Sequence, residues 1–279
     1  MMTNRVRAVE CKKFENGQFS NRPDLVVVEE PMEIRIGFGS KDLRQQRAIA
    51  VTMRTPGHDL ELAAGFLFTE GIISSYGDLL SIKYCTESGK NAEEKNVIRA
   101  EIRPDVAVNL KQADRNFYTT SACGVCGKSS IEAIETGCQP VVKTFVLDKA
   151  IVEQLPEKLR SAQAIFEHTG GLHAAGLFSK AGDLLLLRED VGRHNATDKV
   201  IGAALMKGIV PLADHLLMLS GRISFELVQK AAMAGIPVVA AVGAPSTLAI
   251  DLAVKMNMML CGFIREGRFT VYTGQDQMV

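Results

Sequence analysis

Two cysteines separated by two residues, in the segment Cys123-Gly124-Val125-Cys126, are the most reactive-looking feature of the sequence. The flanking glycines leave both thiols accessible. Lys128 and a helix expected over residues 129–135 follow Cys126, and both would stabilise a thiolate. Such a thiolate can accept a sulfane sulfur as a persulfide, and the neighbouring thiol can later displace that sulfur by forming a disulfide. The pair therefore favours nucleophilic sulfur chemistry.

Two other uses of a C-x-x-C pair stay open at this point. Structural zinc needs four ligands and the chain has no second C-x-x-C, so the site would have to be completed at irregular spacing by Cys85, Cys138, His168 or His173. A thioredoxin-like redox pair would lie between a strand and a helix of a small βαβ domain, whereas this pair follows a long polar stretch in a larger chain. Spacing alone favours neither use.

A second group of candidate residues lies in three turns of the C-terminal half, at residues 190–195, 220–222 and 243–246. Each turn is expected where a strand ends and a helix begins, so their glycines and free helix N–H groups would gather at one sheet edge. Arg193 and Arg222 suit phosphate or carboxylate, Ser220 opens the second turn, and His194 can donate to the same group or make a structural hydrogen bond. These turns predict one anion pocket, although neither the P-loop nor the G-x-G-x-x-G pattern is present.

Composition limits the classes of protein to which the chain can belong. Of its 279 residues 32 are basic and 32 acidic, so the net charge is zero, and the signs are interleaved. This balance argues against a general binder of nucleic acid or of membranes. The most apolar late stretch, residues 246–264, is interrupted by Asp251 and Lys255, and no apolar stretch of a secretion signal follows the basic N-terminal residues. We therefore expect a protein of the cytoplasm, where its six cysteines stay reduced.

Strands dominate the expected structure of residues 1–122. Apolar residues alternate at Met32, Ile34 and Ile36, which is typical of a half-buried strand. Further strands are expected at residues 25–29, 48–53, 82–84 and 97–102, and one helix at 59–70.

Strands and helices alternate beyond residue 148. We expect a helix at 149–168, strands at 172–178 and 184–187, and then helices at 197–206, 225–234 and 247–258 among strands at 215–219, 237–242, 259–264 and 269–272. Asn195 and Asp198 resemble a capping box. The alternation predicts a layered α/β fold, with a mixed and mainly parallel sheet flanked by helices. We divide the chain into a β-rich portion, residues 1–122, and an α/β portion, residues 123–279, which could also form one composite domain.

Five segments together resemble the formate dehydrogenase accessory sulfurtransferases, the FdhD family. They are TPGHDLELAAGFL at 55–67, CGVCG at 123–127, DVGRHNATDK at 190–199, SGRISFE at 220–226 and GFIREGR at 262–268. The likeness extends over nearly the whole chain after about residue 20, with the segments in the family's order.

The resemblance implies a sulfurtransferase that takes persulfide sulfur from a cysteine desulfurase. It would pass this sulfur to the molybdenum or tungsten bis(guanine dinucleotide) cofactor that formate dehydrogenase requires. Mo-bis(molybdopterin guanine dinucleotide) is then a bound acceptor, and no permanently bound metal is implied. The resemblance also implies a cytidine-deaminase-like fold and a homodimer, with Cys123 as the persulfide carrier and Cys126 as its partner.

The cofactor-binding residues implied by the family lie near the C-terminus, and we group them with the residues of the anion turns. The full set is Phe263, Ile264, Arg265, Glu266, Gly267, Arg268, Arg193, His194, Ser220 and Arg222. An alternative is a chaperone that delivers the cofactor without covalent sulfur transfer and so tolerates Cys123→Ala. A zinc-bearing deaminase relative is a third reading, but it would need a His-x-Glu motif, and Ala122 stands where a proline is expected before the first cysteine.

Overall fold

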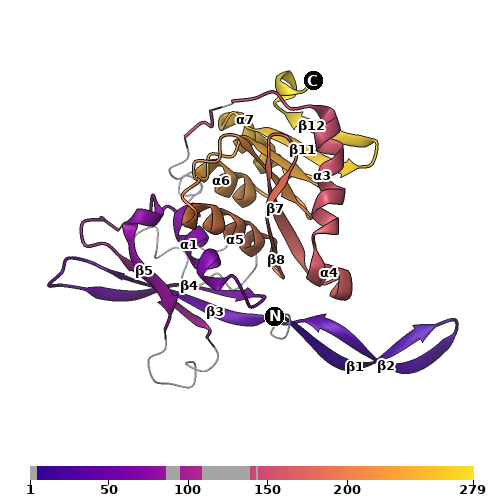
Figure 1. Ribbon diagram of the computed structural model, residues 1–279, viewed down its shortest axis with the longest axis horizontal. Helices are drawn as coiled ribbons and strands as arrows, with labels where there is room; N and C mark the ends of the chain where they lie inside the picture. Colours follow the sequence, from indigo (N-terminus) through magenta and orange to yellow (C-terminus); the bar gives the residue numbers. More distant parts are fainter. Residues whose placement is uncertain (1–4, 86–94, 109–138, 143) are drawn as a thin grey trace.

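The computed structural model describes residues 5–85, 95–108, 139–142 and 144–279, and its named strands form three sheets (Figure 1). A six-stranded sheet belongs to the C-terminal half and a four-stranded sheet to the N-terminal half. A two-stranded arm projects from the body. Among the described helices, none is long and apolar enough to cross a lipid bilayer.

The six-stranded sheet positions the anion turns. Its strands are β7 (His173–Ser179), β8 (Leu184–Asp190), β9 (His215–Leu219), β10 (Val238–Ala241), β11 (Met259–Arg265) and β12 (Arg268–Thr273), in the order β12-β11-β10-β9-β7-β8. The predicted mixed α/β class is confirmed, but the sheet is not mainly parallel: only β9, β10 and β11 are parallel neighbours. Tight turns make β7–β8 and β11–β12 antiparallel hairpins. Because β7 is antiparallel to both β8 and β9, strands β8 to β11 run in one direction and end at one edge.

Helices cover both faces of this sheet. Helices α5 (Arg193–Met206), α6 (Phe225–Met233) and α7 (Thr247–Lys255) share a hydrophobic cluster with one set of strand residues, such as Leu217 and Val239. Helix α3 (Lys149–Ser161), followed by α4 (Ala164–Thr169), packs Leu155 and neighbouring residues on the alternate set, such as Met218. The period of two along each strand thus sends adjacent side chains into different layers.

The single helix expected at residues 149–168 is two helices. The backbone N–H groups of Ile165 and Phe166, at the start of α4, donate to the Glu189 carboxylate on β8 at 3.2 and 2.9 Å. A carboxylate from a distant part of the sequence therefore caps α4. Apolar periodicity continues across the break and so could not reveal it.

Helix α5 begins at Arg193 rather than at residue 197, and Gly192 is its N-cap residue. Asn195 therefore lies in the first turn, and the capping box expected from Asn195 and Asp198 is wrong. The Asn195 amide donates instead to the carbonyl oxygen of Met53 at 2.8 Å, while Asp198 accepts from Lys230 Nζ at 2.9 Å. Both side chains join α5 to other elements.

The four-stranded sheet consists of β3 (Glu30–Phe38), β4 (Gln45–Arg54), β5 (Leu79–Tyr84) and β6 (Val97–Ile102), in the order β4-β3-β6-β5. These strands and α1 (Asp59–Thr69) confirm the predictions for this region, and Met32, Ile34 and Ile36 are fully buried. Two short 3-10 helices complete the described elements, η1 (Tyr76–Asp78) and η4 (Gln275–Gln277).

Helices α1 and α5 join the two halves at a glycine contact. A Cβ on Gly65 would lie 1.9 Å from the backbone oxygen of Asp198, and a Cβ on Gly202 would lie 1.8 Å from that of Glu61. Only glycine allows such backbone approach. One hydrophobic cluster consequently includes side chains of both sheets, such as Ile98 and Leu217.

The arm is formed by β1 (Val6–Glu15) and β2 (Gln18–Val27), of which only residues 25–27 were predicted as strand. Asn16 and Gly17 make the turn between the strands with φ of 51° and 81°. Asn-Gly between two strands is a strong hairpin signal because both residues tolerate positive φ. That dipeptide could have identified the arm.

Candidate functional site

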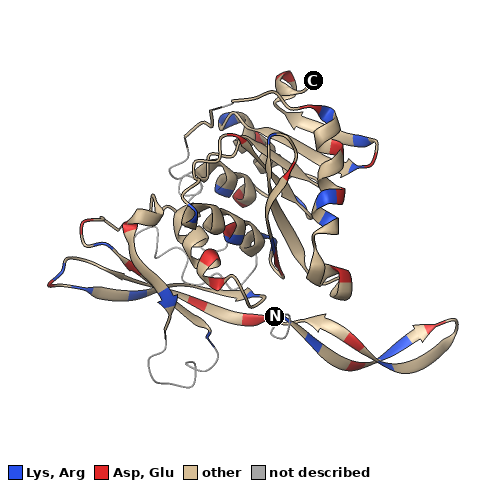
Figure 2. Ribbon diagram, viewed as in Figure 1, with Lys and Arg blue, Asp and Glu red and all other residues tan. Residues whose placement is uncertain are grey.

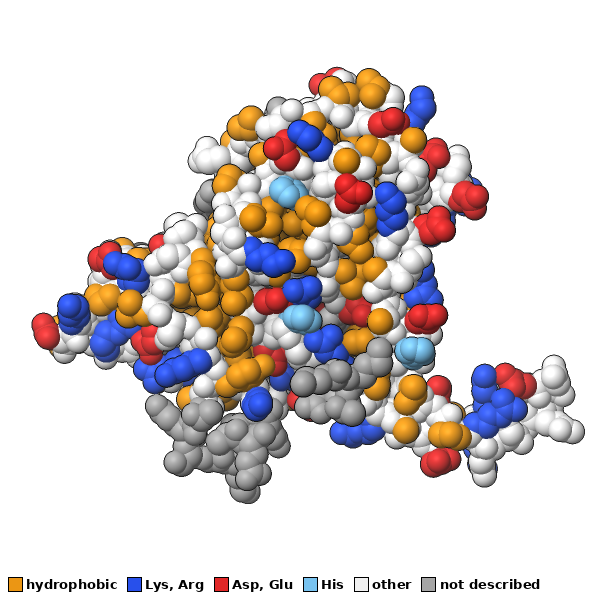
Figure 3. All heavy atoms as spheres, viewed as in Figure 1, with side chains coloured by type: hydrophobic (Ala, Val, Ile, Leu, Met, Phe, Trp, Pro, Cys, Tyr) orange, Lys and Arg blue, Asp and Glu red, His pale blue; other side chains and the backbone are white. Residues whose placement is uncertain are grey.

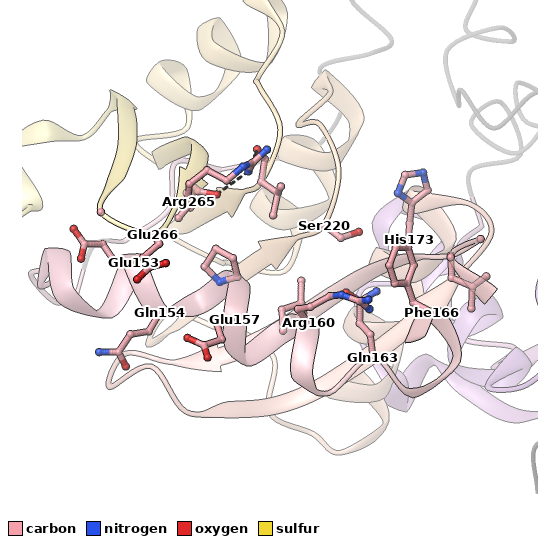
Figure 4. A pocket seen from close by; sticks show the side chains of 18 of the residues that line it. Glu153, Gln154, Glu157, Arg160, Gln163, Phe166, His173, Ser220, Arg265 and Glu266 are labelled. Carbon is pink, nitrogen blue, oxygen red and sulfur yellow. Dashed lines mark hydrogen bonds between the residues drawn. The ribbon is translucent and has the colours of Figure 1, made fainter. Parts of the chain in front are cut away.

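A cavity of about 960 Å³ lies at the edge where β8, β9, β10 and β11 end (Figure 4). One wall comes from the strand ends and the residues just after them, namely Val191, Ser220, Val242 and Ile264 to Gly267. The other wall comes from α3 and α4, and residues 170–173 complete the lining. Ligand pockets typically measure about 300–1,000 Å³, so the cavity has room for a nucleotide-sized group.

The strand-end wall presents polar groups that are fixed by backbone contacts. Ser220 Oγ accepts from the N–H of Ala174 at 2.8 Å, so the hydroxyl can donate its own proton to a ligand. Nη1 of Arg265 donates to the carbonyl oxygens of Val242 and Ile264, each at 2.8 Å. These bonds hold the guanidinium at the cavity rim.

The helical wall carries charged residues that were not among the predicted site residues. Glu153, Glu157 and Arg160 lie on the exposed side of α3, and the Arg160 guanidinium stacks over the Phe166 ring at 4.3 Å. In Figure 4 the carboxylates of Glu153, Glu157 and Glu266 lie toward one end of the cavity. Charged residues on the polar face of an amphipathic helix look the same in sequence whether they face solvent or a ligand.

His173 lies at the other end of the cavity, near Phe166 (Figure 4). It is the first residue of β7 and pairs with Asp190 on β8. Burial lowers its pKa, and the positive charge of Arg193 adds to this effect. The lowered pKa favours the neutral imidazole at pH 7, which can accept one hydrogen bond and donate another.

The remaining turn residues lie outside the lining of this cavity. Arg193 and His194 are in the first turn of α5, and Arg222 follows β9. His194 is buried, with Nε2 3.1 Å from Ser224 Oγ and 3.8 Å from the Glu226 carboxylate. Burial raises the pKa of Glu226, but the nearby His194 imidazole, the backbone N–H of Glu226 and the Ser224 side chain outweigh this effect and lower the pKa to about 2. Of the two roles predicted for His194, hydrogen bonding to an anionic ligand or within the protein, the structure shows the second.

Phe263 and Arg268 line a second cavity, of about 310 Å³, together with Arg265, Phe269 and Thr270. Arg265 belongs to both cavities. Phe263 has φ of 53° at an irregularity in the β11–β12 pairing, and half of its surface is exposed. A bulky residue rarely adopts this left-handed conformation, which costs about 1–3 kcal/mol. The backbone therefore holds an aromatic ring outward at a strained position.

A buried ion pair connects the cavity edge to the N-terminal half. Asp190 accepts from Lys199 Nζ at 2.6 Å and from the N–H of Thr55 at 3.1 Å. Burial lowers the pKa of Lys199, which Asp190 opposes by favouring the charged form. Lys199 also donates to the Thr55 carbonyl at 2.9 Å. The segments 55–59 and 190–199 are therefore held together by charges that lie away from solvent.

Cys123 and Cys126, the sulfur-chemistry candidates, lie outside the described residues, as do Cys138 and the helix expected at 129–135. Of the described cysteines, Cys11, Cys85 and Cys261 are free thiols. Burial raises the pKa of Cys261 to about 12, so it stays a protonated core residue. Within the described part of the chain, no group of three or more His, Cys, Asp or Glu residues could hold a metal ion.

Comparison with known proteins places the chain among a group of named relatives. A sequence profile of the FdhD/NarQ family matches residues 27–279. Proteins named "Sulfur carrier protein FdhD" are 49% identical over 265 residues in Mycolicibacterium paratuberculosis, covering 94% of each chain, and 46% identical over 275 residues in Streptomyces avermitilis, covering 95% of this chain and 93% of the relative. The relative of that name in Sulfolobus acidocaldarius is 38% identical and covers 98% of both chains.

The fold also matches a solved structure. A crystal structure assigned as a formate dehydrogenase accessory protein from Desulfotalea psychrophila superposes with a TM-score of 0.76, over 98% of this chain and 99% of that one. The two sequences are 23% identical. This likeness shows a shared architecture, including the mixed sheets and flanking helices.

Proposed function

This chain belongs to the FdhD/NarQ family, and on that basis we propose that it is a sulfur carrier that serves formate dehydrogenase. Its sulfur donor is a cysteine desulfurase. Its acceptor is the molybdenum or tungsten bis(guanine dinucleotide) cofactor, which binds as the substrate of the transfer. The name shared by relatives that match more than nine-tenths of the chain supports the first of these statements.

Cys123 carries the sulfur in this proposal. Its thiolate attacks the terminal sulfur of the desulfurase persulfide, so the desulfurase cysteine leaves as a thiolate and Cys123 becomes the persulfide. The Cys126 thiolate then attacks the inner sulfur of Cys123, and hydrosulfide leaves toward the metal of the cofactor. The resulting Cys123–Cys126 disulfide needs two electrons from a cellular dithiol before another cycle. Each cycle thus transfers one sulfur atom at the expense of one dithiol.

The cavity at the ends of β8 to β11 is the observation that supports the acceptor. Four strand ends provide backbone groups at one rim, and Arg265 adds a guanidinium fixed by two carbonyl oxygens. Arg160, on α3, also lines the cavity. Two arginines on opposite walls suit a phosphate, since a guanidinium can bind phosphate through two N–H groups.

The acidic end of the same cavity suits a guanine base. The exocyclic amino group of guanine can donate a hydrogen bond to a carboxylate. Glu153, Glu157 and Glu266 supply carboxylates at this end of the cavity. Three carboxylates would repel a phosphate by like charge, so this end of the cavity suits the base rather than the phosphates. In this proposal the base binds beside the glutamates and the phosphates bind between Arg265, which lies next to the glutamates, and Arg160 (Figure 4).

Persulfide formation is tested by intact-protein mass spectrometry after incubation with a cysteine desulfurase and cysteine. We expect a gain of one sulfur atom in the wild-type chain and in Cys126→Ala, and none in Cys123→Ala. A Cys123→Ala variant that still activates formate dehydrogenase would contradict the carrier role and would favour a chaperone that only delivers the cofactor.

Nucleotide binding is tested separately by calorimetry with GDP as the probe. Arg265→Ala should weaken binding about ten- to a hundredfold, because a charge-assisted hydrogen bond contributes about 1.5–3 kcal/mol. Arg103→Ala is a matched control, since Arg103 is a half-exposed arginine paired with Asp105 outside the cavity. Equal affinities for the two variants would remove the cavity as the nucleotide site.

A further inference from the structure

The arm of β1 and β2 lacks the packing that a stable hairpin needs. The two strands pair only with each other among the described residues, and the arm projects from the body (Figures 1 and 3). Near its tip the ring centroids of Phe14 and Phe19 lie 5.0 Å apart, and the two residues are 60% and 72% exposed. A two-stranded hairpin alone is at best marginally stable in water, and three or more strands are usually needed. The arm therefore has the properties of an element that is completed by another chain.

The two edges of the arm differ in their ability to accept another strand. Pro23 lies within β2, opposite Glu10 of β1. A proline has no N–H to donate, so it is tolerated where its nitrogen faces away from the neighbouring strand, and it then blunts that outer edge. The base of β2 is also partly covered, since Val27 lies against Gly171 near α4. The ten residues of β1 contain no proline, so β1 is the open edge.

The position of Pro23 also fixes which groups of β1 point outward. Two residues that face each other in an antiparallel pair either exchange backbone hydrogen bonds or both direct their backbone N–H and C=O groups away from each other. Because the backbone nitrogen of Pro23 faces away from β1, the backbone N–H and C=O of Glu10 face away from β2, toward the open side of β1. Lys12 and Ala8, two residues to either side, do the same.

We propose that β1 pairs antiparallel with β1 of a second copy of this chain, about a two-fold axis at Cys11. This register places Glu10 opposite Lys12 of the partner subunit and Arg7 opposite Glu15 of the partner subunit. By symmetry each pair occurs twice, so four pairs of opposite charge cross the interface. Figure 2 shows acidic and basic residues alternating along the arm, which is the pattern that makes such self-pairing complementary.

Neighbouring registers bring like charges together. An axis at Glu10 would place that residue against its own copy and Arg7 against Lys13 of the partner subunit. An axis at Lys12 would place two lysines face to face. Like charges directly opposite each other destabilise a sheet. The axis at Cys11 avoids all of these contacts.

The pairing has two structural consequences. It completes a four-stranded sheet, in the order β2-β1-β1-β2, which meets the usual requirement for independent stability. It also places Cys11 opposite Cys11 of the partner subunit as a pair without mutual hydrogen bonds, where the Cα atoms lie about 4.5 Å apart. Disulfides span Cα distances of about 4.4–6.8 Å, so mild oxidation can join the two thiols.

Oxidative cross-linking tests the register directly. The full-length protein is treated with copper-phenanthroline, which oxidises two nearby thiols to a disulfide, and is then digested with trypsin without reduction. We expect two copies of the peptide Ala8–Lys12 joined through Cys11, and loss of this species in Cys11→Ser. A covalent dimer joined only through other cysteines would overturn the proposed axis.

A charge exchange tests the interface without oxidation. Glu10→Lys and Lys12→Glu should each raise the dissociation constant of the dimer about tenfold in sedimentation equilibrium, since each reverses two cross-strand pairs. The double variant Glu10→Lys/Lys12→Glu should restore it, because the opposite charges face each other again. Asp24→Lys makes a similar charge change on β2 and should leave the constant unchanged. A protein that stays monomeric, or a double variant no better than the single ones, would refute the pairing.

Discussion

Replacing Gly202 by alanine should reverse the usual effect of that change in a helix. Alanine in a helix interior normally stabilises by about 1 kcal/mol relative to glycine. In α5, however, the new Cβ would lie 1.8 Å from the backbone oxygen of Glu61 and 2.8 Å from the nitrogen of Gly65. A backbone atom cannot rotate away as a side chain can, so α1 and α5 must separate by roughly 1.5 Å to reach normal contact. Overpacking of this kind costs about 1–3 kcal/mol and occasionally more.

Because the clash with a backbone atom lies at the upper end of that range and alanine's helix preference offsets about 1 kcal/mol of it, we expect Gly202→Ala to lower the free energy of unfolding by about 2 kcal/mol, as measured by urea denaturation. Gly77→Ala is the control, because its Cβ would meet only Ser75 Oγ at 3.5 Å and its φ is not in the left-handed region. That variant should lie within about 0.5 kcal/mol of wild type. If Gly202→Ala were as stable as the control, the close helix contact would not exist in solution.

Three further predictions concern single side chains. Glu61 accepts two bonds from Arg188; burial raises its pKa, but the bonds from Arg188 and His58 lower it to about 2. The ionised Glu61 carboxylate should add about 1–2 kcal/mol to the free energy of unfolding after solvent screening. This stabilisation should be present above pH 4.5 and be lost as the pH falls toward 2, and Glu61→Gln should remove this acid dependence in urea melts. Phe263→Gly should relieve the strained φ and leave the protein at least as stable in thermal melts, whereas a lower Tm would mean that the half-exposed ring stabilises the fold by more than the strain costs. Glu189→Gln should weaken the cap of α4, cost about 1 kcal/mol and speed amide exchange at residues 165 and 166, with protection there unchanged if the cap is unimportant.

Elements with a regular apolar period were predictable from the sequence. Met32, Ile34 and Ile36 alternate because one face of β3 is buried, and β9 was predicted with its observed bounds, His215–Leu219. The arm could not be found in this way, because β1 buries neither face and mixes charged and apolar residues without a period. Breaks set by distant residues were equally hidden, since Glu189 caps α4 from another strand.

The candidate site was predictable in part. The expectation that strand-to-helix turns gather at one edge led to Ser220, and the resemblance to a known family led to Arg265, both of which line the cavity. The opposite wall was not predictable, because Glu157 and Arg160 have the spacing of an ordinary solvent-facing helix stripe. Arg193 and His194 were predicted to lie in a loop because the apparent capping box at Asn195 and Asp198 suggested that the helix begins at residue 197, whereas α5 begins at Arg193. They lie in the first turn of the helix, outside the lining of the cavity.

The segments that reveal the family do different physical work, and stability and binding measurements can separate these roles. The segments at 55–67 and 190–199 contain Gly65 and Asp198, whose backbones meet where α1 contacts α5, and the buried pair of Asp190 and Lys199. These contacts join the two halves of the molecule. The segments at 220–226 and 262–268 contribute Ser220 and Arg265 to the cavity instead. Lys199→Met would leave Asp190 buried without its cation, which costs about 3–5 kcal/mol, whereas Arg265→Ala removes a rim contact and should leave the unfolding free energy nearly unchanged. A large loss of stability in Arg265→Ala would mean that the rim arginine holds the fold together, and its effect on GDP binding would then say nothing about the ligand.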